Sequence, residues 1–224
     1  PRIMLSHETA TSTIYASYSK GAKSGGYNTP AFAPLDPLRP EKLTSYEVGL
    51  KANGLNGRLH VSAAGFYYDY KDIQVSYVNS ATGSIGAQNA ASARIYGLEL
   101  NGSMQLTDAF SVHGGGLIER ARFRDYEGAV IYCPASSASP GYPGCPAPSG
   151  KPGLAGGTAD LSGTRIPRAP ELSFSIGADY QFPITDEWKG VLTANDRYPS
   201  SYDLLPGAGG PLRRALHGSV SSNV

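Results

Sequence analysis

The sequence predicts an all-β protein: about eight antiparallel strands that form a segment of a transmembrane β-barrel. Three observations predict this fold. Apolar and polar residues alternate along each long segment, which is the period of a strand with two different faces. Short and long connections alternate strictly, which gathers the short turns at one end of the strands, as in outer-membrane barrels. The chain has 224 residues, with 28 glycines and 15 tyrosines.

The strands are expected in a simple up-and-down order. Their ranges are 2–7, 12–20, 43–51, 58–75, 89–105, 110–126, 170–182 and 188–197. The short turns are expected at 8–11, 53–57, 106–109 and 183–187. The long connections are expected at 21–40, 76–88 and 127–165.

The first two strands lead into a glycine-rich stretch, KGAKSGG, that superficially suggests a phosphate-binding loop. Such a loop requires a glycine directly before its lysine, but Ala22 precedes Lys23. It should also open a helix, whereas the prolines from Pro30 to Pro40 exclude one. The stretch therefore marks the point where a strand leaves the sheet.

The third and fourth strands each carry one apolar and one polar face. On the third, Tyr46, Val48 and Leu50 alternate with polar residues that include Glu47 and Lys51. The fourth has an apolar stripe from Leu59 to Tyr67, which ends at Asp69. Stripes of this length match the roughly 9–11 residues with which a tilted strand crosses a bilayer.

The remaining strands repeat the pattern. On the fifth, Leu98 and Leu100 oppose Glu99 and Asn101. On the sixth, every second residue from Phe110 to Ile118 belongs to the apolar face, and the same alternation continues through three arginines. The seventh has Leu172, Phe174 and Ile176 on one face and Asp179 on the other, and the eighth starts at Trp188. Aromatic residues gather near both ends of the stripes, as in the girdles of membrane barrels. A soluble β-sandwich also alternates, but it would not explain the one-sided distribution of short turns.

The loop at 127–165 is rich in Pro, Gly and Ser, so we expect it to have little core of its own. It contains Cys133 and Cys145, whose spacing fits no zinc motif. A disulfide between them is expected, which implies an oxidising compartment, with two free thiols as the alternative. The net charge of +1 gives no case for a nucleic-acid partner.

Five segments resemble the C-terminal barrel portion of TonB-dependent outer-membrane receptors. They are TIYASYSKGAKSGGYN (13–28), LRPEKLTSYEVGLKANGLNGRL (38–59), AAGFYYDYKDIQVS (63–76), NAASARIYGLELNG (89–102) and RIPRAPELSFSIGADYQF (165–182). The resemblance covers residues 1–198, the predicted partial barrel. Residues 199–224 depart from the pattern and are expected to form an irregular tail.

The resemblance implies a piece of a 22-stranded barrel in the outer membrane of a Gram-negative cell, whose N-terminal plug domain is not in this chain. It implies import of a scarce nutrient, most of all a siderophore–iron complex, driven by the TonB complex. The implied partners are the plug, the remaining strands, membrane lipid and an extracellular small molecule. A passive porin or adhesin is the alternative, and an outer-membrane enzyme is a further one. We find no catalytic constellation, cofactor motif or metal site, so no enzyme activity is expected.

Two groups of site residues follow from the alternation. Glu47, Lys51, Glu99, Asn101 and Asp179 share the polar parity, so they are expected to face the lumen and the plug. Arg120, Arg122 and Arg124 continue the apolar parity of the sixth strand, which places them just beyond the membrane. There they are expected to contact lipopolysaccharide phosphates. We also expect an open sheet with two unpaired edges, because the small polar residues of the inner face cannot fill an eight-stranded barrel.

Overall fold

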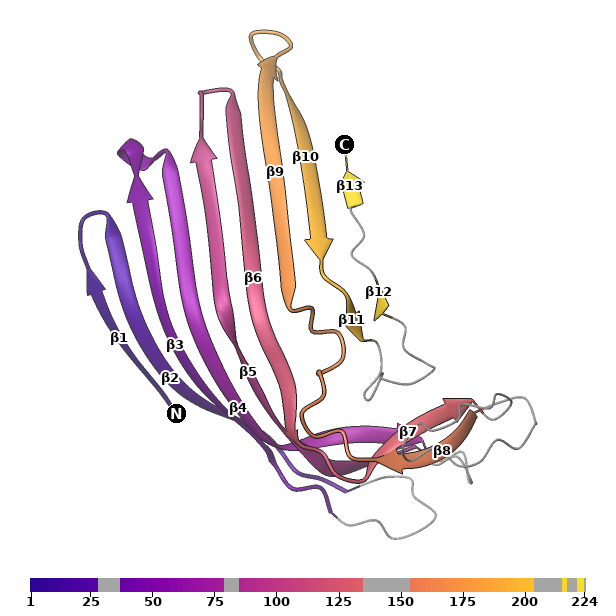
Figure 1. Ribbon diagram of the computed structural model, residues 1–224. Coiled ribbons are helices and arrows are strands. Elements are labelled where there is room, and N and C mark those ends of the chain that lie inside the picture. The colour runs from indigo at the N-terminus through magenta and orange to yellow at the C-terminus, as the bar shows by residue number, and fades with distance from the viewer. Residues whose placement is uncertain (28–36, 79–84, 135–153, 204–214, 217–220, 224) are drawn as a thin grey trace.

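The predicted antiparallel meander is confirmed in the computed structural model (Figure 1). The structure describes residues 1–27, 37–78, 85–134, 154–203, 215–216 and 221–223. The main sheet has the order β1-β2-β3-β4-β5-β6-β9-β10-β13. Its long strands are β1 (Arg2–Glu8), β2 (Ser12–Lys23), β3 (Glu41–Gly54), β4 (Leu59–Val78), β5 (Ile85–Gln105), β6 (Phe110–Asp125), β9 (Leu172–Pro183) and β10 (Lys189–Pro199).

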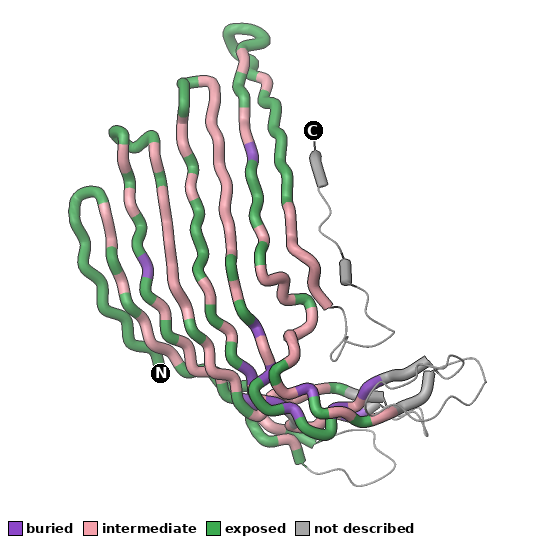
Figure 2. The backbone as a smooth tube through the Cα atoms, viewed as in Figure 1, coloured by how far each residue is buried: buried purple, intermediate pink, exposed green. Residues whose placement is uncertain are grey.

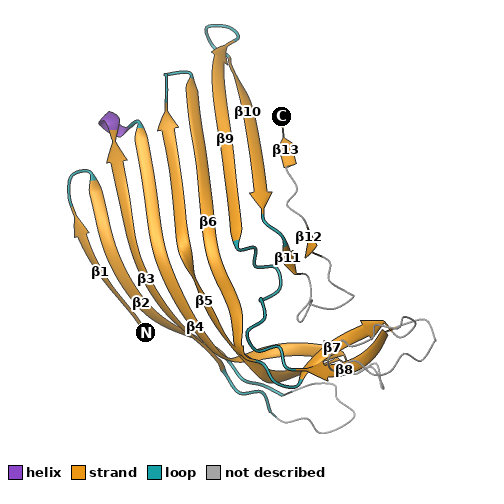
Figure 3. Ribbon diagram, in the orientation of Figure 1, coloured by secondary structure: helices purple, strands orange, loops and turns teal. Residues whose placement is uncertain are grey.

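Shorter elements complete the described fold. They are the 3-10 turn η1 (Leu55–Gly57) and the strands β7 (Ala129–Pro134), β8 (Leu154–Ala159), β11 (Tyr202–Asp203), β12 (Ala215–Leu216) and β13 (Ser221–Asn223). Figure 3 shows that strands dominate the structure. β7 pairs with β8 and β11 with β12 in two small sheets. In the described part of the chain, no helix is long and apolar enough to cross a bilayer.

Three of the four short turns are held by a threonine hydroxyl. Thr9 accepts hydrogen bonds from the N–H groups of Thr11 and Ser12. Thr107 and Thr185 do the same at the β5–β6 and β9–β10 turns, where each accepts from the N–H groups of the residues two and three positions further along the chain. A hydroxyl that caps the turn in this way supplies a partner for N–H groups that leave the strand ladder. The β3–β4 turn uses η1 instead, with Leu55, Asn56 and Gly57 all at positive φ.

The pairing keeps one register from β1 through β10 with few interruptions. Directly paired residues lie on the same face of a sheet, so the rows can be followed across strands. One row joins Val48, Gly65, Leu98, Ile118 and Leu172 on the apolar face. The large side chains of this row are exposed to the surroundings of the chain, for example Leu98 and Ile118 at 66% and 61%. The apolar stripes of the separate strands therefore merge into one continuous exposed face.

The ends of β4, β5 and β6 that carry the long connections bend away from the rest of the sheet (Figure 1). The β4–β5 register shifts between Tyr70 and Gln74, where Asp72 has φ 55°, and the β5–β6 register shifts at Ser92/Ala93. Bulges of this kind bend a strand and increase its twist. We call this bent part, with β7, β8 and residues 161–166, the outer extension.

The loop at 127–165 was expected to have little core of its own, and its described residues take part in a core shared with β5 and β6. The buried hydrophobic cluster of the described chain lies where β5, β6 and the described ends of this loop meet, among the purple segments at the bent end of the sheet in Figure 2. Its members are Ala91, Ala93, Phe123, Tyr126, Ala129, Ile131 and Leu161. Residues 161–166 run beside β6 and form backbone hydrogen bonds with Phe123 and Ala121. The described ends of the loop are thus folded against β5 and β6, because their few large apolar residues pack with those of the two strands.

Truncating the outer core should open the outer extension without disturbing the main sheet. We expect Phe123→Ala to cost this unit about 3–5 kcal/mol, because Phe123 is 6% exposed and would leave a cavity. Hydrogen exchange by mass spectrometry, on protein in detergent, should then show faster exchange in β7, β8 and residues 161–166. The matched control is Phe174→Ala on the exposed apolar face, which should leave that exchange unchanged. Equal protection of β7 and β8 in both variants would contradict the prediction.

The sheet is open at both sides in the described residues, as expected. β1 pairs only with β2, and β13 pairs with β10 over three residues. Unpaired strand edges are not tolerated in lipid and favour association in water. We therefore expect the isolated 224-residue chain in detergent to migrate identically on a gel with and without boiling. A faster-migrating unboiled band, the mark of a closed barrel, would contradict this.

Candidate functional site

The polar face of the sheet is the first candidate site, and it brings the predicted inward-facing residues together. Lys51 pairs with Ser62, and Ser62 pairs with Asn101 on the neighbouring strand. Glu99 and Glu47 have the same parity as these residues. Asp179 pairs with Ser111, which belongs to the same face of β6. All five residues thus lie on one side of the sheet, opposite the apolar face.

The acidic side chains of this face are paired with neighbours on adjacent strands or two residues away. The Tyr15 hydroxyl donates to Glu47 Oε1 at 2.7 Å, and Asn101 Nδ2 donates to Glu99 Oε1 at 2.8 Å. Thr193 Oγ1 donates to Asp179 Oδ1 at 2.7 Å. These hydrogen bonds hold the carboxylates along the wall, so the face presents a fixed polar pattern to whatever lies over it.

A histidine completes the cluster around Asp179, which sequence reasoning did not single out. His113 Nδ1 lies 3.4 Å from Asp179 Oδ2, and His113 Nε2 lies 3.0 Å from Asn195 Oδ1. The sequence did carry one indication of this cluster. Strand alternation puts His113, Asp179 and Asn195 on the polar face of β6, β9 and β10. The indication was hard to use because the long connection 127–165 separates β6 from β9 in the sequence.

Two glycines let large polar-face side chains lie flat against the sheet. The Tyr15 ring occupies the space that a Cβ on Gly49 would need, and His113 and Asn195 occupy that space at Gly177. An alanine at either position would push these side chains off the wall. The glycines therefore keep the polar face low and nearly smooth.

The hollows on this face are shallow and open. One, of about 440 Å³, is lined by Lys51, Asn53, His60, Asn101 and their neighbours. A second, of about 370 Å³, lies between Glu99, Ser173 and Arg197. Within the described ranges, no three His, Cys, Asp or Glu side chains gather as metal ligands would. The geometry suits contact with another protein surface better than enclosure of a small molecule.

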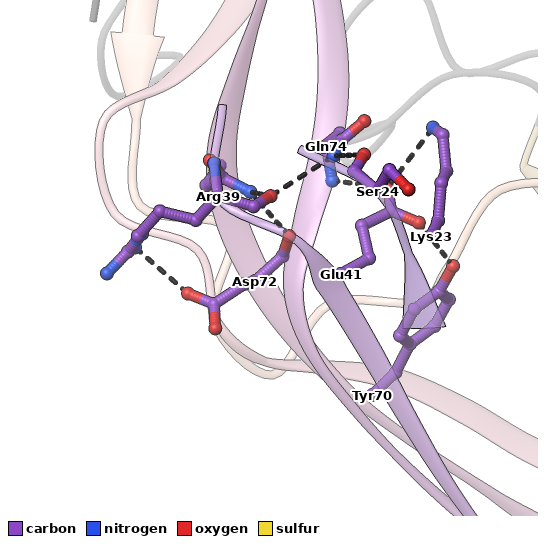
Figure 4. Close-up of polar contacts among 8 residues, drawn as sticks. Lys23, Ser24, Arg39, Glu41, Tyr70, Asp72 and Gln74 are labelled. Atoms are coloured by element: carbon purple, nitrogen blue, oxygen red, sulfur yellow. Dashed lines mark hydrogen bonds and ion pairs between the residues drawn. The ribbon is translucent and has the colours of Figure 1, made fainter. Parts of the chain in front are cut away.

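A second candidate lies at the outer end of β2, β3 and β4, where Glu41 is buried with 4% of its surface exposed (Figure 4). Its carboxylate accepts from the Tyr70 hydroxyl at 2.7 Å and from the Gln74 N–H at 2.6 Å, and Lys23 Nζ lies 3.5 Å away. We call Lys23, Glu41, Tyr70 and Gln74 the outer junction. It joins the start of β3 to the bulge of β4.

The charge of Glu41 is stabilised by these partners. Burial by itself raises the pKa of a carboxyl group, but the Tyr70 and Gln74 hydrogen bonds and the Lys23 charge outweigh it, so the pKa of Glu41 lies below its ordinary value. Burial and the hydrogen bond to this carboxylate raise the pKa of Tyr70 to about 12. Tyr70 also packs against the outer core, so the outer junction and the core support each other.

Polar contacts extend from the outer junction along both flanking segments. Arg39 Nη2 lies 3.0 Å from Asp72 Oδ1. Gln74 Nε2 donates to the backbone carbonyls of Ser24 and Arg39, and Asn89 Nδ2 donates to those of Arg39 and Asp72. The chain ends on both sides of the connection between β2 and β3 are thereby tied to β4 and β5.

The three predicted arginines of β6 do not have equal surroundings. Arg120 is exposed and pairs with Tyr96 on the apolar face. Arg122 is half-buried and forms an ion pair with Glu171, at 3.2 Å, which Arg165 also contacts. Arg124 is exposed and is the extra residue of the β5–β6 bulge. Cys133 belongs to β7, but Cys145 lies outside the described residues, so the disulfide stays a prediction.

Comparison with known proteins identifies what this architecture is similar to. The family model "TonB dependent receptor-like, beta-barrel" matches residues 1–214. No curated protein matches the chain.

Among solved structures, the ferric yersiniabactin uptake receptor FyuA from Yersinia pestis is similar with a TM-score of 0.68 and 18% identity. The match covers 99% of this chain and 28% of that one. The siderophore receptor PiuA from Acinetobacter baumannii is similar with a TM-score of 0.65 and 17% identity. That match covers 99% of this chain and 28% of PiuA. The copper transporter OprC is similar with a TM-score of 0.57 and 18% identity. That match covers 91% of this chain and 26% of OprC. Identities this low show a shared fold, and the chain spans just over a quarter of these structures.

Removing the buried charge should weaken the outer junction in a pH-dependent way. We expect Glu41→Gln to cost about 1–3 kcal/mol of local stability at pH 7, because the charged hydrogen bonds lose strength. The depressed pKa of Glu41 gives a contribution that is present above the unfolded-state pKa and is lost as the pH falls through the folded-state pKa. The difference between wild type and variant should therefore shrink below about pH 4.

Thermal unfolding of the outer extension at pH 7 and at pH 3 would measure that difference. The matched control is Glu127→Gln, which removes an exposed carboxylate near the same end of the sheet. The outer extension of this control variant should unfold at the same temperature as that of the wild type, both at pH 7 and at pH 3. A difference between wild type and Glu41→Gln that stays constant from pH 7 to pH 3 would contradict the assigned role of the charge.

Proposed function

The chain belongs to the TonB-dependent receptor-like β-barrel family, and from this membership we propose that it forms part of the wall of an outer-membrane receptor for energised nutrient import. The observation that carries the proposal is the family match over residues 1–214. The family is one of receptors and transporters and not of enzymes. The exposed apolar face, bounded by aromatic residues, supports a place in the outer membrane of a Gram-negative cell.

The proposed cargo is a ferric siderophore. Similar solved structures include receptors for ferric yersiniabactin and for ferric catecholates, and the copper transporter OprC widens the range to other scarce metals. The cargo would be bound from outside by the outer ends of the strands together with parts of the receptor beyond this chain.

The polar face is proposed to line the lumen and to meet the plug domain of the same receptor. Its carboxylates are already hydrogen-bonded along the wall, as at Tyr15–Glu47 and Thr193–Asp179, so they keep a polar partner when a second protein surface covers them. The remaining barrel strands would pair with the open edge of β1 and, at the other side of the sheet, beyond β10 and β13. Energy would come from the TonB complex, which acts through the plug.

Uptake measurements separate energised import from a passive porin or an adhesin. Cells that express the complete receptor carrying this chain should take up ⁵⁵Fe supplied as a ferric siderophore. Deletion of TonB should abolish that uptake, whereas deletion of an unrelated porin should not. Uptake that continues without TonB would favour the passive barrel, and an outer-membrane protein that gives no uptake of any ferric siderophore would overturn the proposed cargo.

A further inference from the structure

We infer that His113 and Asp179, side by side on the polar face of β6 and β9, form a binding site for a divalent transition-metal ion such as Cu²⁺ or Zn²⁺. The inference goes beyond the proposed import function, because this ion is a separate ligand from a ferric siderophore, whose iron already has a chelator around it. It rests on the contacts of one imidazole ring and of the carboxylate beside it.

The hydrogen bond on one side of the His113 ring decides where a neutral ring carries its proton. His113 Nε2 lies 3.0 Å from Asn195 Oδ1. An amide oxygen only accepts hydrogen bonds, so Nε2 is the donor and holds the proton. The other ring nitrogen, Nδ1, then has a free lone pair, and this is the nitrogen that lies next to Asp179.

The spacing of the two facing atoms suits a shared metal ion. His113 Nδ1 lies 3.4 Å from Asp179 Oδ2, and no hydrogen bond joins these two atoms, which both belong to the described part of the chain. A hydrogen bond needs the oxygen near the line of the N–H bond, whereas two ligands of one ion meet that ion at an angle. Zinc bonds of about 2.0–2.2 Å to a nitrogen and an oxygen at a tetrahedral angle put these two ligand atoms about 3.4 Å apart.

Both ligand side chains are held in place from behind. Asn195 fixes the His113 ring, and Thr193 Oγ1 donates to the second carboxylate oxygen, Asp179 Oδ1, at 2.7 Å. The absence of a Cβ at Gly177 leaves the room that His113 and Asn195 occupy. A metal-binding histidine usually donates its other N–H group, and a metal-binding carboxylate is usually hydrogen-bonded as well. The pair therefore has the supporting contacts of a metal site.

The two ligands also define the class of ion. Imidazole nitrogen suits Cu²⁺, Zn²⁺ and Ni²⁺, whereas Mg²⁺ and Ca²⁺ take oxygen ligands. The side chains of His113 and Asp179 are 42% and 31% exposed, so water or a second protein surface can supply the remaining ligands. A site with two protein ligands and open positions binds an ion that can exchange.

His60 provides a matched comparison on the same face. It pairs with Ser103, and Ser103 pairs with His113, so the two histidines lie in one row of the sheet. His60 Nδ1 also has an asparagine partner, Asn53 Oδ1 at 2.7 Å. Within the described residues, however, His60 has no carboxylate partner. It therefore lacks the second ligand that Asp179 gives to His113.

Copper titrated into the complete receptor in detergent, and followed by electron paramagnetic resonance, tests the site. The spectra of wild type and His113→Gln should differ by one Cu²⁺ ion coupled to a single imidazole nitrogen. Asn195→Ala keeps both ligands but frees the ring, so it should bind this copper about ten- to a hundredfold more weakly. Asp179→Asn should bind it more weakly still. The control His60→Gln should keep the wild-type spectrum, and an excess of Zn²⁺, but not of Ca²⁺, should displace the copper.

Heat-modifiable migration of each variant shows whether the barrel is closed, so a lost signal is not mistaken for unfolding. If His113→Gln does not form a closed barrel, Asn195→Ala supplies the same comparison. Equal copper spectra for wild type and His113→Gln would overturn the inference and leave an ordinary ion pair between a protonated His113 and Asp179. Loss of the same signal in His60→Gln, or displacement of the copper by Ca²⁺, would overturn it as well.

Discussion

The antiparallel register of the main sheet is the constraint on which the rest of the structure depends. Side chains alternate with a period of two, so a slip of one residue between two strands would exchange the apolar and the polar face of one of them. The pairing of Tyr46 with Tyr67 and of Tyr67 with Tyr96 places these three tyrosines side by side on the apolar face. The same register places His113 beside Asp179. Turn threonines such as Thr107 help to set it, because they fix where each strand begins.

At the outer end, a second interaction decides how the long connections leave the sheet. Burying the Glu41 carboxylate is unfavourable by itself. A hydroxyl, a backbone N–H and an ammonium group satisfy it, and the lowered pKa of Glu41 shows that these partners outweigh the burial. The hydroxyl of Tyr70 belongs to this polar junction, and its ring packs against the apolar core. Order in the outer extension is therefore shared between packing and hydrogen bonding, and neither part stands alone.

The strands and their two faces could be predicted because alternation is a local property of the sequence. The shared face of Glu47, Glu99 and Asp179 followed from parity alone. The outer core could not be predicted in this way, because Ile131 and Leu161 lie far apart in a Pro/Gly/Ser-rich segment and no local alternation relates them to Phe123 or Tyr126. They become a core only when the bulges of β4 and β5 bend the sheet toward them.

The same limit explains the two polar clusters that sequence reasoning missed. Glu41 follows Pro40 at the end of a long connection, where a solvated carboxylate is the ordinary reading, and its burial depends on Tyr70 and Gln74 from another strand. The pairing of His113 with Asp179 spans 66 positions of sequence. The contrast between Arg120 and Arg122 likewise depends on Glu171, a residue from beyond the long connection.

The outer core has a consequence for recognition by other molecules. A connection without a core would present many conformations, so an antibody raised against it would bind a linear peptide about as well as the protein. Here Ala93, Phe123 and Leu161 fix the relative positions of three segments that are distant in sequence. The surface above them is consequently a discontinuous epitope with a defined shape. A binding protein selected against the folded chain would recognise that shape and would ignore the corresponding peptides.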